Sequence, residues 1–190
     1  MARDISIILP AKNEAESLII LLPRLRKHYP EEEIIVVNDG SGDHTAEICN
    51  QNHVTVVSHV YSMGNGAAIK TGARNASGDI LVFMDADGQH NPADINRLIE
   101  KLDDGFDMAV GARHTDTHAS RARKIGNSLF NKLASWMTGY PIKDLTSGFR
   151  AARAKHFKRF LYLLPNKFSY PTTITMAFFR SGLPVAYVPI

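Results

Sequence analysis

The sequence predicts an α/β protein with a mostly parallel sheet covered by helices on both faces. Two observations lead to this fold class. Short apolar runs alternate with longer segments of helical period along residues 1–112. The apolar runs are continuous, which is typical of strands that are buried on both faces of a parallel sheet. A chain of 190 residues is long enough for one domain with a substantial core.

Five strands and four helical segments are expected in this first part. Each strand is a short aliphatic run, and the helical segments carry apolar residues three or four positions apart. We expect Asn13 to cap the first helix, Pro23 to interrupt or kink it, and Pro92 to lie near the start of the fourth. The expected strands are 5–9, 33–37, 54–58, 80–84 and 108–112, and the expected helical segments are 11–29, 40–52, 66–76 and 91–104.

The pattern changes after residue 112. Residues 121–139 are expected to form one basic amphipathic helix, because their apolar residues recur at helical spacing. Residues 144–164 predict a loop, a short strand and a basic helix, and residues 185–190 predict a last strand. The helix 121–139 has two interpretations: it packs on the sheet, or it lies on an anionic membrane surface.

Composition excludes several protein classes. A chain with 44% hydrophobic and 22% charged residues is not expected to be disordered. Its single cysteine, Cys49, cannot form an internal disulfide and fits a reducing compartment. We find no signal-peptide layout and no run of the roughly 18 apolar residues that a membrane span needs. We therefore expect a cytoplasmic protein.

Charge is divided unevenly along the chain. Residues 1–112 hold 9 Lys and Arg against 17 Asp and Glu, whereas residues 113–190 hold 13 against 2. Two explanations remain open: solvated helix faces, or an anionic partner such as phosphate or a membrane surface. Nucleic acid is disfavoured, because the basic part has few exposed-looking aromatic residues and the acidic part would repel a phosphate backbone.

Polar clusters follow four of the expected strands, at residues 10–14, 38–43, 85–89 and 111–113. The carboxyl ends of parallel strands share one edge of a sheet, so these clusters are expected to meet there. Carboxylate and carboxamide oxygens are hard ligands that suit Mg²⁺ or Mn²⁺, and Mg²⁺ commonly shares its coordination with substrate phosphates. The simplest ligand is therefore a metal-bound diphosphate. Asp39 is expected to accept from a base N–H or a ribose hydroxyl.

The glycine-rich stretch at residues 64–72 is not a conventional phosphate motif. It lacks the glycine that precedes the lysine of a P-loop, and Ile69 occupies the third glycine position of a dinucleotide fingerprint. Gly64 and Gly66 are better explained by a tight turn or a close backbone approach. Lys70 is expected to face either solvent or the nucleotide.

Six motifs occur in order along almost the whole chain. They are Pro10-x-x-Asn13-Glu14, Asn38-Asp39-Gly40-Ser41-x-Asp43-x-Thr45, Gly64-x-Gly66-x-Ala68, Asp85-Ala86-Asp87-Gly88-Gln89-His90, Gly111-Ala112-Arg113 and Asp144-x-x-Ser147-Gly148-Phe149-Arg150. Together they resemble family 2 glycosyltransferases, and most closely the dolichyl- or polyprenyl-phosphate sugar transferase branch. Lys12 stands where this family often has an aromatic residue, and Asn38 where it often has Asp.

The resemblance implies a GT-A-like three-layer fold in a single domain, 1–190. Residues 1–112 would bind the nucleotide-sugar, and the basic residues 113–190 would form the acceptor side. By position, the residues implied for substrate binding are Pro10, Lys12, Glu14, Asp39, Asp85, Ala86, Arg113 and Arg123. The residues implied for Mg²⁺ or Mn²⁺ are Asp85, Asp87 and Gln89. Family members usually continue with a basic segment, so the resemblance also implies truncation after Ile190.

The implied reaction is inverting transfer of a sugar from GDP-mannose or a UDP-sugar to a polyprenyl or dolichyl phosphate. An ionised phosphate needs no general base, so catalysis reduces to positioning and charge neutralisation by the metal on Asp87 and by Arg113, Arg121, Arg123 and Arg150. If the acceptor is a hydroxyl instead, Asp144 is the expected base. The expected place of work is the inner face of the membrane, with peripheral contact through residues 113–180.

Two other functions compete with this one. Nucleotidyltransferases that make nucleotide-sugars usually have a glycine- and arginine-rich loop after the first strand, and residues 10–17 contain no glycine. A catalytically impaired nucleotide-binding or interaction module stays open at this point, because the chain ends at Ile190 where the family usually continues.

Overall fold

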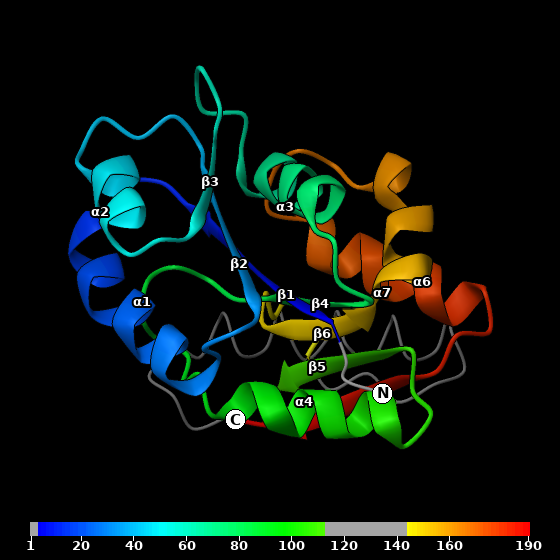
Figure 1. Ribbon diagram of the computed structural model, residues 1–190. Helices are drawn as coiled ribbons and strands as arrows, with labels where there is room; N and C mark the ends of the chain where they lie inside the picture. Colours follow the sequence, from blue (N-terminus) through cyan, green and yellow to red (C-terminus); the bar gives the residue numbers. More distant parts are fainter. Residues whose placement is uncertain (1–3, 113–143) are drawn as a thin grey trace, which may run out of the picture.

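The computed structural model describes residues 4–112 and 144–190. These residues form a seven-stranded sheet with helices on both faces (Figure 1). The strand order across the sheet is β3-β2-β1-β4-β6-β5-β7. The strands are β1 (Ile5–Ala11), β2 (Glu33–Asn38), β3 (Thr55–Ser58), β4 (Ile80–Phe83), β5 (Met108–Ala112), β6 (Arg150–Arg153) and β7 (Val185–Pro189). The prediction of a mostly parallel sheet is confirmed.

Strand β6 is antiparallel to both of its neighbours, whereas the other strand pairs are parallel. Its first residue, Arg150, pairs with Phe83, the last residue of β4. The residues just before β6 therefore lie at the same edge of the sheet as the residues just after β4. This reversal brings the motif at 144–150 next to the motif at 85–90.

Within the described residues, three helices cover each face of the sheet. The helices α1 (Ala15–His28), α2 (Thr45–Gln51) and α4 (Asp94–Asp103) contribute to one hydrophobic core. The helices α3 (Asn65–Asn75), α6 (Ala154–Arg159) and α7 (Tyr170–Arg180) contribute to the other, with a short 3-10 helix, η1 (Leu161–Leu163), between the last two. The three-layer arrangement matches the expected fold.

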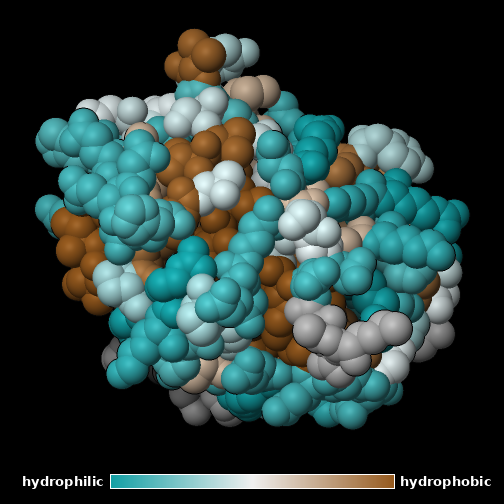
Figure 2. All heavy atoms as spheres, in the orientation of Figure 1, coloured by the Kyte–Doolittle hydropathy of each residue, from teal (hydrophilic) through white to brown (hydrophobic). Residues whose placement is uncertain are grey.

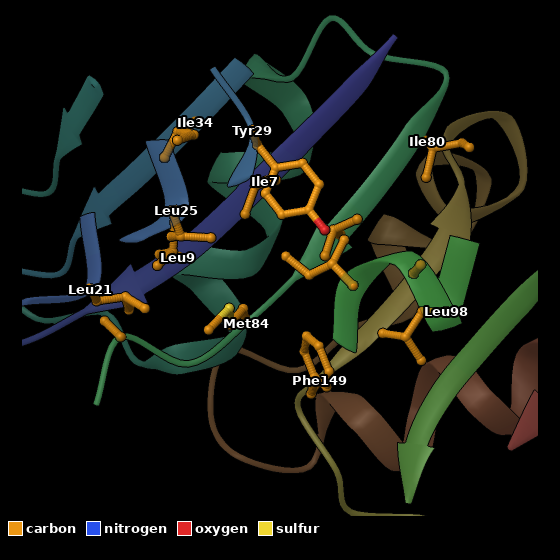
Figure 3. Packing of buried hydrophobic residues seen from close by; sticks show 14 of the residues in the cluster. Ile7, Leu9, Leu21, Leu25, Tyr29, Ile34, Ile80, Met84, Leu98 and Phe149 are labelled. Carbon is orange, nitrogen blue, oxygen red and sulfur yellow. The ribbon is translucent and has the colours of Figure 1, made fainter. Parts of the chain in front are cut away.

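The first core is built from large aliphatic side chains. Leu21 and Leu25 of α1, four residues apart, pack with Ile7 and Leu9 of β1 and with Leu98 of α4 (Figure 3). Such residues are fully buried, and burial of a leucine contributes about 1.5–3 kcal/mol. The apolar runs and the apolar positions of the helical segments in the sequence are the residues that form this core.

Small residues let α3 approach the sheet closely on the other face. A Cβ atom added to Gly72 would lie 2.3 Å from Cγ2 of Ile8. Ala68 and Ala73 of the same helix are fully buried beside it. The close approach fixes the start of α3 near the carboxyl ends of β1 and β2.

Three local predictions need correction. Asn13 does not cap α1: Glu14 precedes the helix, and Asn13 has a φ of 56° and accepts a hydrogen bond from the Gly42 amide. Pro23 does not interrupt α1, because it lies on the exposed side, where water can satisfy the carbonyl that a proline leaves without a partner. Helix α7 was not predicted, because its Thr-rich sequence has low helix propensity; it forms in the fold, where it buries Ile174 and Phe178.

Candidate functional site

A cavity of about 730 Å³ opens at the carboxyl edge of the sheet. Loops after β1, β2 and β4 contribute to its wall, as the parallel topology predicts. Seven of the predicted residues line it: Pro10, Lys12, Glu14, Asp39, Asp85, Ala86 and Asp87. The cavity is large enough for a nucleotide-sized ligand.

The loops after β1 and β2 are held together by hydrogen bonds between backbone and side chain. The Asn13 amide donates to Ser41 Oγ (3.0 Å), and the Gly42 amide donates to Asn13 Oδ1 (2.9 Å). The Glu14 amide donates to Thr45 Oγ1 (3.1 Å). The motif residues that sequence analysis singled out at 13 and 41–45 therefore organise one wall of the cavity.

Asp39 organises a second loop, between β3 and α3. One carboxylate oxygen accepts from the Met63 amide (2.8 Å) and lies 2.7 Å from Nδ1 of His59. The other accepts from Ser62 Oγ (2.8 Å) and the Gly64 amide (2.9 Å). Burial raises the pKa of Asp39, but these hydrogen bonds lower it by a larger amount, so that the pKa falls from 3.8 to about 2. Both oxygens are thus already engaged in shaping residues 59–64.

The loop that Asp39 organises projects from the molecule. It is the loop at the top of Figure 1, and Figure 2 shows a hydrophobic projection at the same place. Val60 is 99% exposed and Tyr61 69% exposed, while Ser62, Met63 and Gly64 line the cavity. Of this loop only Gly64 belongs to a predicted motif, and Ser62 and Met63 were not predicted to be part of the site.

Asp85 and Asp87 differ in environment although they are two residues apart. Asp85 is half-buried against the backbone of Gly148, where an added Cβ atom would lie 2.9 Å from Asp85 Oδ2. The ring of His90 lies 3.9 Å from the same oxygen through Nε2 and stacks on Phe149 at 4.7 Å. Asp87 is exposed, and one of its oxygens accepts from the Gln89 amide (3.0 Å).

The two carboxylates fit a divalent cation that shares its coordination with a ligand. Among the described residues there is no cluster of three or more His, Cys, Asp or Glu side chains that would enclose a metal. Mg²⁺ does not require one, since it commonly binds one or two carboxylates and completes its shell with water and phosphate oxygens. Asp85 and Asp87 on the cavity wall supply such a pair. Gln89 does not line the cavity, and its role as a ligand stays a prediction.

Arg150 does not have the phosphate-binding role expected of it. Its side chain is fully buried and donates to the carbonyl oxygens of Ser147 and Pro171 and to Thr175 Oγ1. Burial lowers the pKa of its guanidinium group. Arg150 therefore braces α7 behind the cavity instead of meeting a ligand.

Two other predicted residues lie apart from the cavity. One oxygen of Asp144 accepts from the amides of Thr146 and Ser147 and from Thr146 Oγ1, so it shapes the turn before β6. Lys70 does not line the cavity: its Nζ donates to the Leu164 carbonyl (2.9 Å) and to Asn166 Oδ1 (2.6 Å).

Some predictions fall on residues that the structure does not describe. Arg113, Arg121, Arg123 and the expected helix 121–139 belong to this group. Conversely, the structure adds cavity residues from the carboxyl-terminal part that sequence reasoning did not select. They are Thr146, Lys167, Phe168, Tyr170 and Pro171, and they lie beside Gly148 of the motif at 144–150.

A model of the family described as Glycosyl transferase family 2 matches residues 6–161. The chain belongs to glycosyl transferase family 2. It is therefore a glycosyltransferase, and the alternative of a binding module without catalytic function is set aside. The matched range includes all seven predicted residues that line the cavity.

Relatives within the family include transferases named for polyprenyl phosphates. The chain is 30% identical to polyprenol monophosphomannose synthase of Mycolicibacterium smegmatis, over 97% of this chain and 75% of that protein. It is 33% identical to undecaprenyl-phosphate 4-deoxy-4-formamido-L-arabinose transferase of Photorhabdus laumondii, over 80% of this chain and 49% of that protein. The resemblance to the polyprenyl-phosphate branch of the glycosyltransferases is confirmed.

Solved structures of glycosyltransferases have the same fold. Glucosyl-3-phosphoglycerate synthase from Mycobacterium tuberculosis, crystallised with Mn²⁺ and UDP-glucose, superposes with a TM-score of 0.79 at 24% identity. The match covers 99% of this chain and 69% of that one. The expected GT-A fold is thereby confirmed. Among the described residues of our chain, none of the helices is long and apolar enough to cross a membrane.

Proposed function

We propose that this glycosyltransferase moves a sugar from a nucleotide-sugar, GDP-mannose or a UDP-sugar, to a polyprenyl phosphate, with inversion at the anomeric carbon. The observation that carries the proposal is the single cavity in which Lys12, Glu14 and Asp39 share a wall with Asp85 and Asp87. Relatives named for mannose and aminoarabinose transfer to polyprenyl phosphates support the acceptor class.

The nucleotide-binding part of the proposal assigns Pro10, Lys12 and Glu14 to the nucleoside side. Asp39 acts chiefly through the loop that it holds, because both of its oxygens are engaged by residues 59–64. Asp85 and Asp87 would hold Mg²⁺ or Mn²⁺ against the diphosphate. The cation, when bound, supplies charge stabilisation for the departing nucleoside diphosphate.

The acceptor phosphate oxygen would attack the anomeric carbon on the face opposite the leaving diphosphate. One carbon–oxygen bond forms to the lipid phosphate, and the carbon–oxygen bond to the nucleoside diphosphate breaks. No proton needs to be removed, because the phosphate is already ionised near neutral pH. The protein's task is then to align two anionic groups and to offset their repulsion.

A transfer assay with purified protein tests the function. Undecaprenyl phosphate in detergent is offered with GDP-mannose, UDP-glucose or a UDP-amino sugar, with Mn²⁺, Mg²⁺ or EDTA. We expect one donor to give a glycolipid product that disappears with EDTA. The variant Asp87→Asn should lose at least about a hundredfold in rate, whereas Asp79→Asn, an exposed carboxylate outside the cavity, should keep full activity. Transfer that persists in Asp87→Asn would remove the metal role, and glycosylation of a soluble alcohol in place of the lipid phosphate would favour the hydroxyl alternative.

We also propose that the transfer takes place at the cytoplasmic face of a membrane, which the protein contacts peripherally through the basic residues 113–180. Support comes from the exposed Val60, Tyr61 and Phe168, which lie on loops that also line the cavity. Apolar side chains beside basic ones favour anionic bilayers. Co-sedimentation with vesicles of phosphatidylglycerol and phosphatidylcholine measures this contact, and equal recovery in the supernatant with and without vesicles at low salt would contradict it.

A further inference from the structure

One wall of the cavity is a short loop that the sequence did not single out. Residues 165–168, which we call the strap, connect η1 to α7, and Lys167 and Phe168 of the strap line the cavity. In Figure 1 it is part of the orange segment that runs beside α3. Both side chains are exposed, and Phe168 is 83% exposed.

The backbone of the strap is fixed to the start of α3. The Ala67 amide donates to the Asn166 carbonyl (3.0 Å), and Lys70 Nζ donates to the carbonyl of Leu164 and the side chain of Asn166. A loop whose backbone is anchored while its tip faces a cavity has the construction of a binding element.

Two glycines make this anchoring possible. A Cβ atom at Gly66 would lie 2.1 Å from the Pro165 carbonyl oxygen, and one at Gly64 would lie 2.5 Å from the Asn166 carbonyl oxygen. Real Cβ atoms do not approach backbone so closely, so only glycine permits the contact. The motif Gly64-x-Gly66, which fits neither of the common phosphate fingerprints, thus serves to seat the strap.

The charges around the cavity give Lys167 a particular place. Among the described residues that line it, four are acidic (Glu14, Asp39, Asp85 and Asp87), and two are basic (Lys12 and Lys167). Lys12 follows β1, on the side assigned to the nucleoside. Lys167 belongs to the wall that also includes Thr146, Gly148 and Tyr170.

We infer that the strap binds the lipid-phosphate acceptor, Lys167 at the phosphate and Phe168 at the adjoining hydrocarbon. This inference rests on the proposed function. A lysine followed in the chain by an exposed phenylalanine, both lining the cavity, matches a ligand in which an anionic phosphate adjoins an apolar chain. Arg150 cannot take this part, because it is fully buried and hydrogen-bonded within the protein.

Steady-state kinetics of four purified proteins test the inference: wild type, Lys167→Ala, Phe168→Ala and the control Lys155→Ala. Lys155 is an exposed lysine of α6 that does not line the cavity. Undecaprenyl phosphate is varied at saturating donor, and the donor is varied at saturating acceptor. Circular dichroism and thermal unfolding verify that each variant is folded.

We expect Lys167→Ala to raise KM for undecaprenyl phosphate about tenfold, the loss typical of one charge-assisted contact, with the donor KM unchanged. Phe168→Ala should raise the same KM for undecaprenyl phosphate but not for a short alkyl phosphate. Lys155→Ala should match wild type.

Three outcomes overturn the inference, and they are distinguishable. If Lys167→Ala raises the donor KM and leaves the acceptor KM unchanged, the strap serves the donor diphosphate. If neither KM changes while wild type is active, the strap binds no phosphate and the proposed function stands. If wild type transfers no sugar to any polyprenyl phosphate, the proposed function is wrong, and the inference about the strap is wrong as well.

Discussion

The substitution Asp39→Asn tests whether one buried carboxylate holds the loop that forms part of the cavity wall. Asp39 is only 4% exposed and accepts hydrogen bonds at both oxygens from residues 59–64. Asparagine has the same shape but only one acceptor oxygen. Its amide group would face either the amide of Gly64 and the Ser62 hydroxyl, or the amide of Met63 and His59.

The structure gives the magnitude of the effect. The pKa of Asp39 is lowered from 3.8 to about 2, which corresponds to roughly 2 kcal/mol of stability at neutral pH. Counted instead as buried donors left without an acceptor, the same contacts give about 1–3 kcal/mol. We expect Asp39→Asn to lower the free energy of unfolding by about 2–3 kcal/mol at pH 7.

The pH dependence has a defined sign. Because the folded pKa lies below the unfolded one, the stabilisation is present above pH 3.8 and is lost as the pH falls through about 2. The difference in stability between wild type and Asp39→Asn should therefore narrow by about 1 kcal/mol between pH 5 and pH 3.

Urea unfolding followed by far-UV circular dichroism measures both quantities, with Asp79→Asn as the control because Asp79 is exposed. The control should differ from wild type by less than about 0.5 kcal/mol at each pH. The reasoning would be refuted if the deficit of Asp39→Asn at pH 7 were below about 1 kcal/mol, or if it stayed constant from pH 5 to pH 3.

Three further predictions concern the core and the seat of the strap. Burial raises the pKa of Cys49 to about 11. A thiol reagent at pH 8 should therefore label the folded protein at least about a hundredfold more slowly than the unfolded protein. Rapid labelling of the folded protein would contradict the buried position of Cys49. Gly66→Ala should lower the free energy of unfolding by about 1–3 kcal/mol and reduce transfer activity, because the added Cβ atom meets the backbone of the strap. The control Gly42→Ala has open space around the added Cβ atom and should change neither quantity. Equal urea midpoints for the two variants would show that the strap is not seated on α3. Arg150→Met should cost about 1–3 kcal/mol, since the buried Ser147 carbonyl oxygen loses the donor that Arg150 supplies, and a midpoint within error of wild type would rule out the bracing role.

Much of the fold and one part of the cavity wall could be predicted from the sequence. The strands and helices of residues 5–112 follow from apolar periodicity, which is a local property of the chain. The residues at 10–14, 39 and 85–87 could be placed together because parallel strands end at one edge of the sheet. No tertiary detail was needed for either step.

Other features were decided only by the tertiary structure. Whether Arg150 and Lys70 meet a ligand depends on burial and on distant partners, and both turned out to hydrogen-bond within the protein. The antiparallel β6 brings Gly148 against Asp85, an outcome of strand order that no local pattern encodes.

The layered fold, the edge of the sheet that carries the site and the acidic chemistry there all follow from the amino-acid sequence, because apolar periodicity and parallel strand order specify them. Only the tertiary structure decided which cations are available at that edge. The identity of a residue as lysine or arginine does not reveal whether its side chain is buried, hydrogen-bonded to a carbonyl oxygen or exposed in a cavity. The difference lies in long-range packing, such as the approach of residues 165–168 to Gly64 and Gly66, which leaves Lys167 facing the carboxylates' cavity.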